Sequence, residues 1–553
     1  MLDSHTSEKA DKLSNLQVAD RVMRRWEAAK TERMRWMSLW DEMAKYVRPE
    51  RDEVFRRHGD SGPPAAGNFL FDGTPISANM VLASGCMSRL TPAQAPWFAF
   101  DPPRALKTKD AVKRWYAECT EIAIEALATS NFYTELHECY LDRGAFGTCL
   151  LHVEGSTGMD SPLVFRAHEI GHYALSLGAD GRINTVFREL EFTPAQAAQE
   201  YGEQALPECL KKVLKEQPHS QEKHAFIHAI YPREEAERDR LKMDGANKPV
   251  ASVHIYVKER LIVRNAGYDE MPAIGSRYLR WGTGAYGICP AWMAMADCRS
   301  LNELQMNLDV LAGLHAFPRI LAPHDFEGMI DLRQGQVTFY KDENRMPREW
   351  ATQGKYDIGM ERVQARQKAI RDFFHVELFQ MWSAITKQMT AFEVSAREQE
   401  KIELFSPTFT MLSSEMYGPL LRRVFALLLR QGVFPQPPQE AVYVNSAGRY
   451  AIPDPEIRYT SRLALALKAV HAGAFDRSMG RLQALAQVRP DVLDNINMDR
   501  AVRDMAMNEG LPVEWITPED EVTALRDARA EQQAQQEQMQ QAMMGAEMAG
   551  KMK

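Results

Sequence analysis

Two helical segments on either side of a short insert constrain the fold of this chain more than any other feature. The first begins at Pro290 and ends before Pro318, with leucines at i, i+3, i+7 and i+10. Residues 319–356 then read as short strands and turns, and a helical pattern returns over 357–380. The pattern predicts a helix, a small β-containing insert and a returning helix. The leucines of the first helix are Leu301, Leu304, Leu308 and Leu311.

The composition is that of an ordinary globular protein. The 553 residues suffice for about three or four domains at roughly 150 residues each. With 45% hydrophobic and 26% charged residues, the chain is neither wholly disordered nor fibrous. Lys and Arg number 67 against 75 Asp and Glu, which gives a net charge of −8. This acidic balance excludes nucleic-acid binding through bulk positive charge, because an acidic surface repels phosphate.

The cysteines and the N-terminal residues favour a soluble intracellular product. The seven cysteines are odd in number and none are spaced as CxxC, so neither a disulfide scaffold nor a Cys-rich zinc site is expected. The start, MLDSHTSEKADKL, lacks the apolar run of a secretory signal. The longest uncharged stretches, such as 74–88, are shorter than a membrane span, so we expect no membrane association.

The chain before residue 290 combines helices with a β-rich block. Thr193-Pro194 marks one more helix start, because a capping hydroxyl precedes a proline at the first helical position. The mixture predicts the α+β class. The helices are expected at 16–48, 74–90, 108–129 and 132–143, with an extended stretch at 91–103. The strands are expected in CLLHVE, LVFRAHE, HYALSL and TVFRELEF and in the runs 224–231 and 252–263.

Helical patterns dominate the chain after residue 390. A long helix is expected over 391–431 with an interruption near Ser406-Pro407, followed by the linker FPQPP. Residues 458–530 are helical in character. The tail 531–553 is rich in Gln, Met, Ala and Glu, and it either frays or joins an intersubunit bundle.

His168-Glu169-Ile170-Gly171-His172 is a literal HExxH motif. On a helix this spacing places two imidazoles on one face for zinc, with the glutamate as general base. Here the flanking runs alternate as strands, and His168 and His172 in a strand lie roughly 13 Å apart at about 3.3 Å per residue. One zinc ion cannot bind both at that separation. We therefore interpret them as strand histidines beside a bulge or turn at Gly171.

Gly282, Gly284 and Gly287 form a literal GxGxxG motif. A dinucleotide site needs this loop inside a βαβ unit, with an acidic residue ending the second strand. Here the chain continues as one long helix, and Asp309 falls inside it. We interpret the glycines as a flexible joint that leads into the helix.

Other catalytic patterns are missing from the sequence. It contains neither a P-loop motif nor a GxSxG nucleophile elbow. The carboxylates are spread over helix faces, and the tryptophans of the first helix have the spacing of core residues. The absence of a complete catalytic constellation favours a structural or interaction protein. We predict no catalytic residues, no bound metal and no cofactor.

Several segments, taken in order, resemble one family, the head-to-tail connecting (portal) proteins of short-tailed, podovirus-like bacteriophages. Each segment is weak alone, but the ordered set covers about 40–520 and is specific. The first are WDEMAKYVRP (40–49), FDGTPISANMVLASG (71–85), LTPAQAPWFAF (90–100), SNFY (130–133) and RGAFGT (143–148). The others are YGICPAWMAMAD (286–297), LNELQ (301–305), MTAFEVSAR (389–397), GVFPQPP (432–438), LALALKAV (463–470), RPDVLDNINMD (489–499) and NEGLP (508–512).

The resemblance implies a ring, typically a dodecamer, at one capsid vertex, with genomic DNA passing through its channel. Its subunit fold has an α/β wing, a two-helix stem, a small β-containing clip and a helical crown. The helix–insert–helix pattern is what a stem and clip require. The implied parts are a wing at 1–289, stem helices at 290–315 and 357–377, a clip at 316–356, a tunnel loop at 378–390, a wing return helix and linker at 391–457, a helical crown at 458–530 and a low-complexity tail at 531–553.

The resemblance also implies the partners and the place of action. The protein would be a non-enzymatic channel for genome packaging and ejection and a docking platform for the terminase large subunit and tail proteins. Double-stranded DNA, capsid and scaffold proteins and a tail adaptor protein are the expected partners. The virion portal vertex is the expected location, after assembly in the host cytoplasm.

Lys387 is the candidate DNA-channel residue, because it lies in the implied tunnel loop. An ordinary solvated lysine is the interpretation that we favour. Two other functions stay open on the sequence alone. One is a zinc metallohydrolase that uses His168, Glu169 and His172, and the other is a different virion component, such as a tail adaptor or an internal scaffold.

Overall fold

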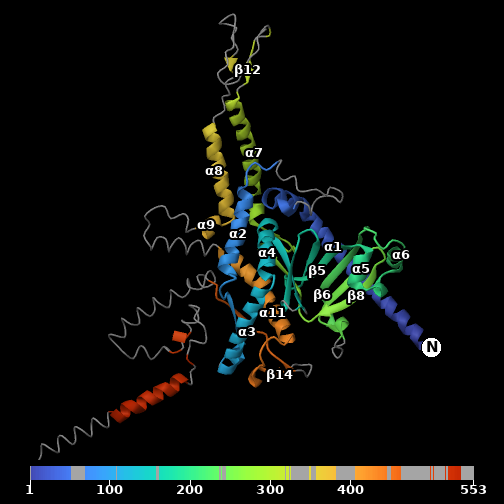
Figure 1. Ribbon diagram of the computed structural model, residues 1–553, viewed down its shortest axis with the longest axis vertical. Helices are drawn as coiled ribbons and strands as arrows, with labels where there is room; N and C mark the ends of the chain where they lie inside the picture. The colour runs from blue at the N-terminus through green and yellow to red at the C-terminus, as the bar shows by residue number, and fades with distance from the viewer. Residues whose placement is uncertain are drawn as a thin grey trace, which may run out of the picture. The chain divides into compact units, whose positions relative to one another are not determined.

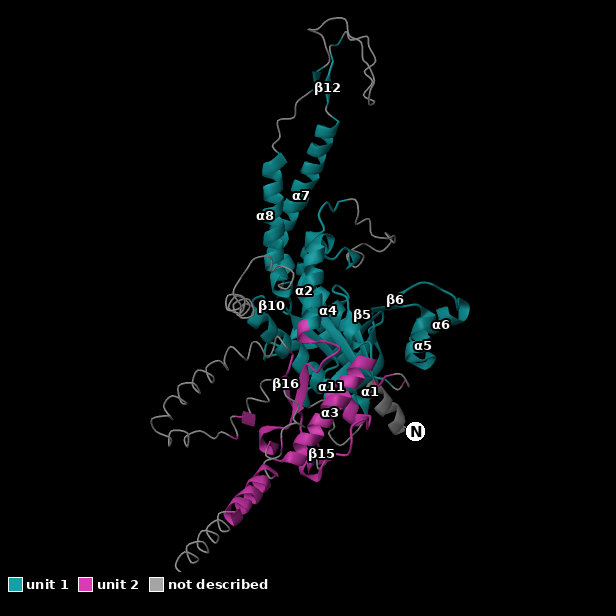
Figure 2. Cartoon of the chain, turned by 60° about the vertical axis from the view of Figure 1, so that its left-hand side comes forward, with its two compact units in different colours: residues 1–88, 130–156, 163–423 teal, residues 89–129, 157–162, 424–553 magenta. Residues whose placement is uncertain are grey.

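The chain forms two compact units, each described by itself. Unit 1 comprises residues 1–88, 130–156 and 163–423, and unit 2 comprises residues 89–129, 157–162 and 424–553 (Figure 2). Both units contain helices and strands, so the predicted α+β class is confirmed. The computed structural model describes residues 2–51, 69–107, 109–156, 158, 161–235, 238, 244–317, 319–322, 324, 348–349, 356–380, 405–444, 450–461, 499, 502–503, 517 and 521–536, with side chains from residue 15 onward.

A five-stranded antiparallel sheet in unit 1 is covered on one face by helix α1 (Leu2–Val47). The helix buries small and apolar side chains at helical spacing, including Val22 and Trp26, against Phe187 and Ile227 of the sheet. Trp40 is also fully buried, so the interpretation of the tryptophans as core residues is confirmed for Trp26 and Trp40. The strand order is β4 (Tyr173–Leu177), β5 (Ile183–Phe192), β6 (His224–Pro232), β7 (Val250–Tyr256) and β8 (Leu261–Tyr268).

The run 252–263, expected as one strand, is a hairpin, so that prediction is wrong. β7 and β8 pair antiparallel, and the charged residues Lys258, Glu259 and Arg260 belong to the connection between them. Arg260 adopts a left-handed backbone conformation with φ of 51°. The apolar residues on both sides belong to neighbouring strands of one sheet, and this is why the run reads as a single strand.

The second sheet of unit 1 has three antiparallel strands and packs against α4 (Phe132–Phe146). Its order is β3 (Leu163–His168), β2 (Thr148–Gly155) and β9 (Ala273–Arg277). α2 (Thr74–Leu90) has the bounds that the sequence predicts. α5 (Pro194–Tyr201) begins at a capping box in which Thr193 and Gln196 exchange hydrogen bonds, and α6 (Glu208–Glu216) follows it.

The helices around the insert are α7 (Pro290–Ala316) and α8 (Tyr356–Phe373), and Figure 1 shows them side by side. The predicted helices are confirmed, with a break before α9 (Val376–Phe379), where His375 has φ of 53°. Of the insert, the structure describes a two-residue pairing of β12 (Ile320–Leu321) with β13 (Arg348–Glu349). This pairing brings two segments of the insert together just beyond the end of α7.

Residues 405–412 are helical, 413–417 form a π-helical turn, and α11 (Gly418–Arg430) follows. Ser406 and Pro407, where the sequence predicts an interruption, both lie within the helical stretch 405–412. Residues 391–404 of the predicted helix lie outside the described residues.

Unit 2 is built around α3 (Asp110–Thr129) and an aromatic cluster. Phe425 contacts Trp115, Tyr116, Phe100 and Phe434 at ring-centroid distances of 5.2–6.1 Å. β1 (Phe98–Asp101) pairs with β16 (Glu456–Tyr459), and β14 (Tyr443–Val444) pairs with β15 (Tyr450–Ala451).

The prediction of helix from residue 458 is wrong at its start. Arg458 and Tyr459 are strand residues, because they pair with Ala99 and Phe98 of β1. Most of the predicted helical region 458–530 lies outside the described residues, but residues 521–536 are helical. Among the helices that the structure describes, none has the length and apolarity needed to cross a bilayer.

Candidate functional site

The α7–α8 hairpin is closed by a narrow apolar seam. Leu301 and Leu308 of α7 and Val363 and Ile370 of α8 are buried. At Gly359 the two helices approach so closely that an added Cβ would lie 2.5 Å from a methyl group of Leu308. The helices therefore form a tightly packed pair along this seam.

Polar contacts fix the base of the hairpin to the rest of unit 1. Arg366 Nη1 donates to Asp297 Oδ1 at 2.5 Å and links α8 to α7. Gln367 Nε2 donates to Asp72 Oδ2 at 2.7 Å, just ahead of α2. Asn302 Nδ2 donates to a backbone carbonyl of the same segment at 2.8 Å. The hairpin is thus anchored at the residues nearest α2, while the insert lies at its other end.

The outer surface of the hairpin carries large apolar side chains. Phe317, directly after α7, is 80% exposed, and Val310 is 58% exposed. Exposed large apolar side chains, when they gather on one surface, mark interaction sites. The exposed apolar residues of the hairpin and its insert are Met306, Val310, Phe317, Leu321, Tyr356 and Ile358.

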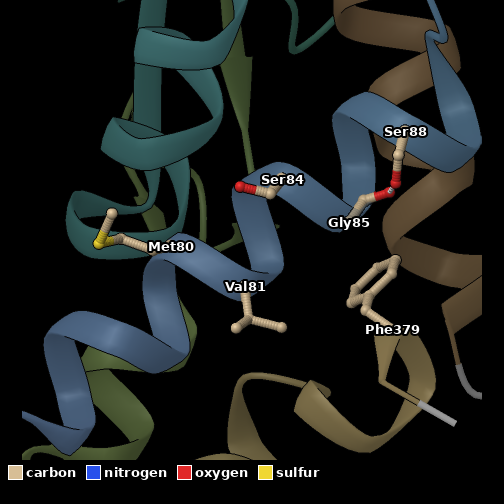
Figure 3. A pocket seen from close by; sticks show the side chains of 6 residues that line it. All are labelled: Met80, Val81, Ser84, Gly85, Ser88 and Phe379. Carbon is tan, nitrogen blue, oxygen red and sulfur yellow. Dashed lines mark hydrogen bonds between the residues drawn. The ribbon is translucent and has the colours of Figure 1, made fainter. Parts of the chain in front are cut away.

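A hollow of about 380 Å³ lies where α9 meets α2 (Figure 3). Phe379 of α9 points toward Gly85, and a Cβ at Gly85 would lie 2.2 Å from the ring. None of the six lining residues has an acidic or basic side chain, so the lining offers the hydroxyls of Ser84 and Ser88 no general base to activate them as nucleophiles. The lining residues are Met80, Val81, Ser84, Gly85, Ser88 and Phe379.

The HExxH residues lie at a turn between two strands. β3 ends at His168, Gly171 has φ of 97°, and His172 precedes β4. Oε2 of Glu169 lies 3.5 Å from Nδ1 of His172, and this contact, followed by the charge of Arg51, from which Glu169 also accepts, lowers the pKa of its carboxyl. The interpretation of a turn at Gly171 is confirmed, and the helix that the zinc motif requires is absent at these residues.

The described residues also contain no group of three or more His, Cys, Asp or Glu side chains placed to hold a metal ion. His168 is half-buried, whereas His172 is exposed. The two imidazoles therefore lie in different environments on opposite sides of the turn.

The GxGxxG glycines belong to a hairpin turn. β10 (Leu279–Arg280) pairs antiparallel with β11 (Gly287–Ile288), and Gly282 in the turn has φ of 54°. The backbone N–H of Ala285 donates to Oε1 of Glu32 at 2.9 Å, so a carboxylate lies where a phosphate would have to bind. This segment leads into α7 as the joint interpretation predicts, and it lacks the parallel βαβ unit of a dinucleotide site.

Lys387, the candidate DNA-channel residue, lies outside the described residues. The same is true of most of the implied clip and of all but the first three residues of the implied tunnel loop 378–390. The channel assignment of Lys387 therefore stays a prediction.

Sequence reasoning missed two polar clusters inside unit 1. Arg277 and Glu415 form a buried ion pair, with Nη2 and Oε1 2.6 Å apart. His228 and His254 stack in the interior of the five-stranded sheet. The signal was present for the histidines, because both sit in strands between apolar residues. It was absent for Glu415, which lies in a helix far along the chain.

Comparison with known proteins identifies the family. Residues 19–516 match the model of the bacteriophage head to tail connecting protein family. The chain belongs to this family. It is 30% identical over 540 residues to the probable portal protein of Bordetella phage BPP-1, covering 96% of this chain and 94% of that protein. It is 26% identical over 524 residues to the portal protein of Salmonella phage epsilon15, covering 93% and 91%.

The match to the head-to-tail connecting family confirms the resemblance found in the sequence. The chain is a structural portal protein of a bacteriophage virion, and its relatives are structural portal proteins as well. Nothing in the comparisons or in the described residues supports a zinc metallohydrolase.

Proposed function

We propose that copies of this portal protein assemble into a ring, with twelve subunits as the expected number, at one vertex of the capsid. The observation that carries the proposal is the exposed apolar surface of the α7–α8 hairpin, in a chain that matches a connector family over residues 19–516. A ring of identical subunits needs a heterologous interface that closes on itself, so each copy must bury two different surfaces. In this proposal α7 and α8 are the stem, and residues 316–356 are the clip.

The ring is a channel for double-stranded DNA during packaging and ejection. The exposed charges of α8 nearly cancel, which supports weak binding of DNA phosphates. The basic residues Arg362, Arg366, Lys368 and Arg371 oppose the acidic residues Asp357, Glu361 and Asp372, which leaves +1 from 4 − 3. Affinity for DNA grows with each phosphate that a basic residue neutralises. If α8 faces the channel, its nearly neutral surface therefore lets DNA slide past. Lys387 stays the candidate contact of the tunnel loop.

The ring is also a docking platform with no chemistry of its own. The sequence contains no P-loop, so the ATP hydrolysis that drives packaging belongs to a partner, the terminase large subunit. Capsid and scaffold proteins surround the ring during assembly in the host cytoplasm, and a tail adaptor protein binds it afterwards. The wing (1–289 and 391–457) and the crown (458–530) are the surfaces proposed for these contacts.

Electron microscopy of the purified full chain, combined with native mass spectrometry, tests the proposal. We expect annular particles with an open centre and a mass close to twelve times 62.9 kDa. Another closed ring number would correct the subunit count alone. Persistent monomers, both with and without the scaffold protein, would contradict the ring.

A further inference from the structure

Two histidine rings are stacked in the interior of unit 1. His228 of β6 and His254 of β7 are directly opposite each other in the register of the five-stranded sheet. Their ring centroids are 3.9 Å apart and their planes differ by 14°. The side chains are buried, with residue exposures of 2% and 7%. Two imidazolium ions at this separation would repel each other strongly, so the stack favours neutral rings.

The hydrogen bonds of His228 independently require a neutral ring. Nη1 of Arg188 lies 3.3 Å from Nδ1 of His228, and Nε2 of His228 lies 2.9 Å from Oγ of Ser252. A guanidinium can only donate, so Nδ1 must accept and the ring proton must sit on Nε2. A second proton on Nδ1 would point an N–H at another N–H and break this contact.

The three-stranded sheet contributes two more histidines to the same cluster. The ring of His152 on β2 lies 6.4 Å from that of His228 and 5.9 Å from that of His168. Nε2 of His152 contacts Oε1 of Glu154 at 2.9 Å, and the same oxygen accepts from the hydroxyl of Tyr268 on β8 at 3.0 Å. The cluster thus joins one sheet to the other.

Positive charge dominates around the histidines. Arg264 and Arg423 have carboxylate partners in Glu200 and Glu270, both at short distances, and Glu154 is the remaining acid. Further protons would therefore enter a site that already repels them. The titratable and charged groups facing the histidines are Arg188 from β5, Arg166 from β3, Glu154 from β2, Arg264 and Tyr268 from β8, Tyr201 from α5 and Arg423 from α11.

We propose that the cluster of His152, His168, His228 and His254 is an acid-sensitive joint: it stabilises the folded arrangement of the two sheets of the portal protein at neutral pH, and its contribution to the free energy of unfolding declines in mild acid. The joint is a property of unit 1 in each subunit, so it does not depend on the ring or on DNA. The geometry carries it: four imidazoles between two sheets, two of them stacked, and one held neutral by an arginine donor.

The direction of the pH effect follows from linkage. Burial and neighbouring arginines lower the pKa of His254 to about 3 and that of His168 to about 2, and burial first of all lowers the pKa values of His152 and His228. In the unfolded chain the four histidines bind protons near their ordinary pKa of 6.5. Their contribution to the free energy of unfolding is therefore complete above pH 6.5 and is lost as the pH falls below it. Each histidine changes the unfolding constant by up to about tenfold per pH unit.

The pH window separates the histidines from the acid beside them. A hydrogen bond from His152 is the main cause that lowers the pKa of Glu154, to about 2. Its contribution is present above its ordinary pKa of 4.5 and is lost only as the pH falls below that value. Between pH 6.5 and 4.5 the loss of stability from this cluster therefore comes from the histidines.

Unfolding of the full chain in denaturant, followed from pH 7.5 to 4.8, tests the joint. The slope of the logarithm of the unfolding constant against pH counts the protons taken up on unfolding. In the double variant His228→Asn/His254→Asn the slope between pH 6.5 and 4.8 should fall by about two protons. The matched control His219→Asn changes an exposed histidine and should leave the slope unchanged. An equal slope in the double variant and the wild type would overturn the proposal.

A second measurement needs no substitution and decides the matter if the double variant does not fold. Deuterium exchange at the imidazole C2 position, read by mass spectrometry, reports the protonation of each histidine in the folded wild-type chain. We expect His228 and His254 to remain neutral down to pH 5. Protonation of either one near pH 6.5 in the folded state would refute the joint.

Discussion

The β-rich block and the α7–α8 hairpin of unit 1 place polar and apolar groups in opposite ways. Inside the block, Arg277 and Glu415 are 1% and 7% exposed, and hydrogen bonds satisfy the guanidinium on every side. On the hairpin, Val310 and Phe317 lie in the open although both are apolar. One region buries charge, and the other exposes hydrocarbon.

The difference shows which region is complete within a single chain. A buried charge is costly unless a partner in the same fold matches it, and Glu415 provides that match for Arg277. Exposed apolar surface gains free energy only when another surface covers it. The buried ion pair is therefore matched within one chain, and the hairpin is a region whose stability should change on assembly.

Glu415→Ala has the largest expected effect, and it tests whether the buried charge of Arg277 is matched within one chain. It removes the partner of Arg277 and leaves an uncompensated buried charge, which costs about 3–5 kcal/mol of unfolding free energy. Denaturant unfolding of the purified chain measures this loss. The control Asp20→Ala breaks the exposed pair with Arg260 and should cost no more than about 1 kcal/mol. An equal loss of unfolding free energy in the two variants would show that Glu415 does not compensate the buried charge of Arg277.

Leu304→Pro tests the hairpin as an assembly element. A proline inside α7 removes a backbone hydrogen bond and costs about 3 kcal/mol or more. We expect rings to be lost in electron micrographs, whereas Leu304→Met, which keeps side-chain volume, should assemble normally. Normal rings with the proline variant would show that α7 is not part of the stem.

Gly85→Ala breaks the contact between α2 and α9. The new methyl group would lie 2.2 Å from the ring of Phe379, so the ring has to move. Overpacking costs about 1–3 kcal/mol, partly offset by up to about 1 kcal/mol of helix propensity. Thermal unfolding should show a lowered Tm, and Phe379→Leu in the same chain should restore part of it. An unchanged Tm for the single variant would argue against the packing of α9 on α2.

Sequence patterns predict the parts of this fold that depend on local signals. The bounds of α2 agree with the prediction at both ends, because Thr74-Pro75 and the turn after Leu90 are local features. The helices around the insert and five of the strands follow from periodicity alone. Each of these segments carries its own boundary residues, so no long-range information is needed.

Long-range pairing is what the sequence does not reveal. β16 pairs with β1 from the other end of the chain, and the strand character of Arg458 depends on that partner. The Arg277–Glu415 pair is hidden for the same reason, since the burial of Glu415 is set by Arg277 across the fold. The family resemblance supplied the function, because no local motif carries catalysis here.

Gly313→Ala has the smallest expected effect of these substitutions, and it tests whether α7 contacts a neighbouring subunit near its C-terminal end. Gly313 lies on the exposed side of α7 near its end, and nothing lies within 4 Å of an added Cβ. In the isolated chain an alanine should therefore stabilise the helix by about 0.5–1 kcal/mol, measured by denaturant unfolding of the monomer. If a neighbouring copy packs closely here in the ring, the same methyl group should weaken assembly, measured by the protein concentration at which rings dissociate. A gain in the monomer together with a loss in the ring would place a subunit interface at this point of α7, and gains in both would place the interface elsewhere on the hairpin.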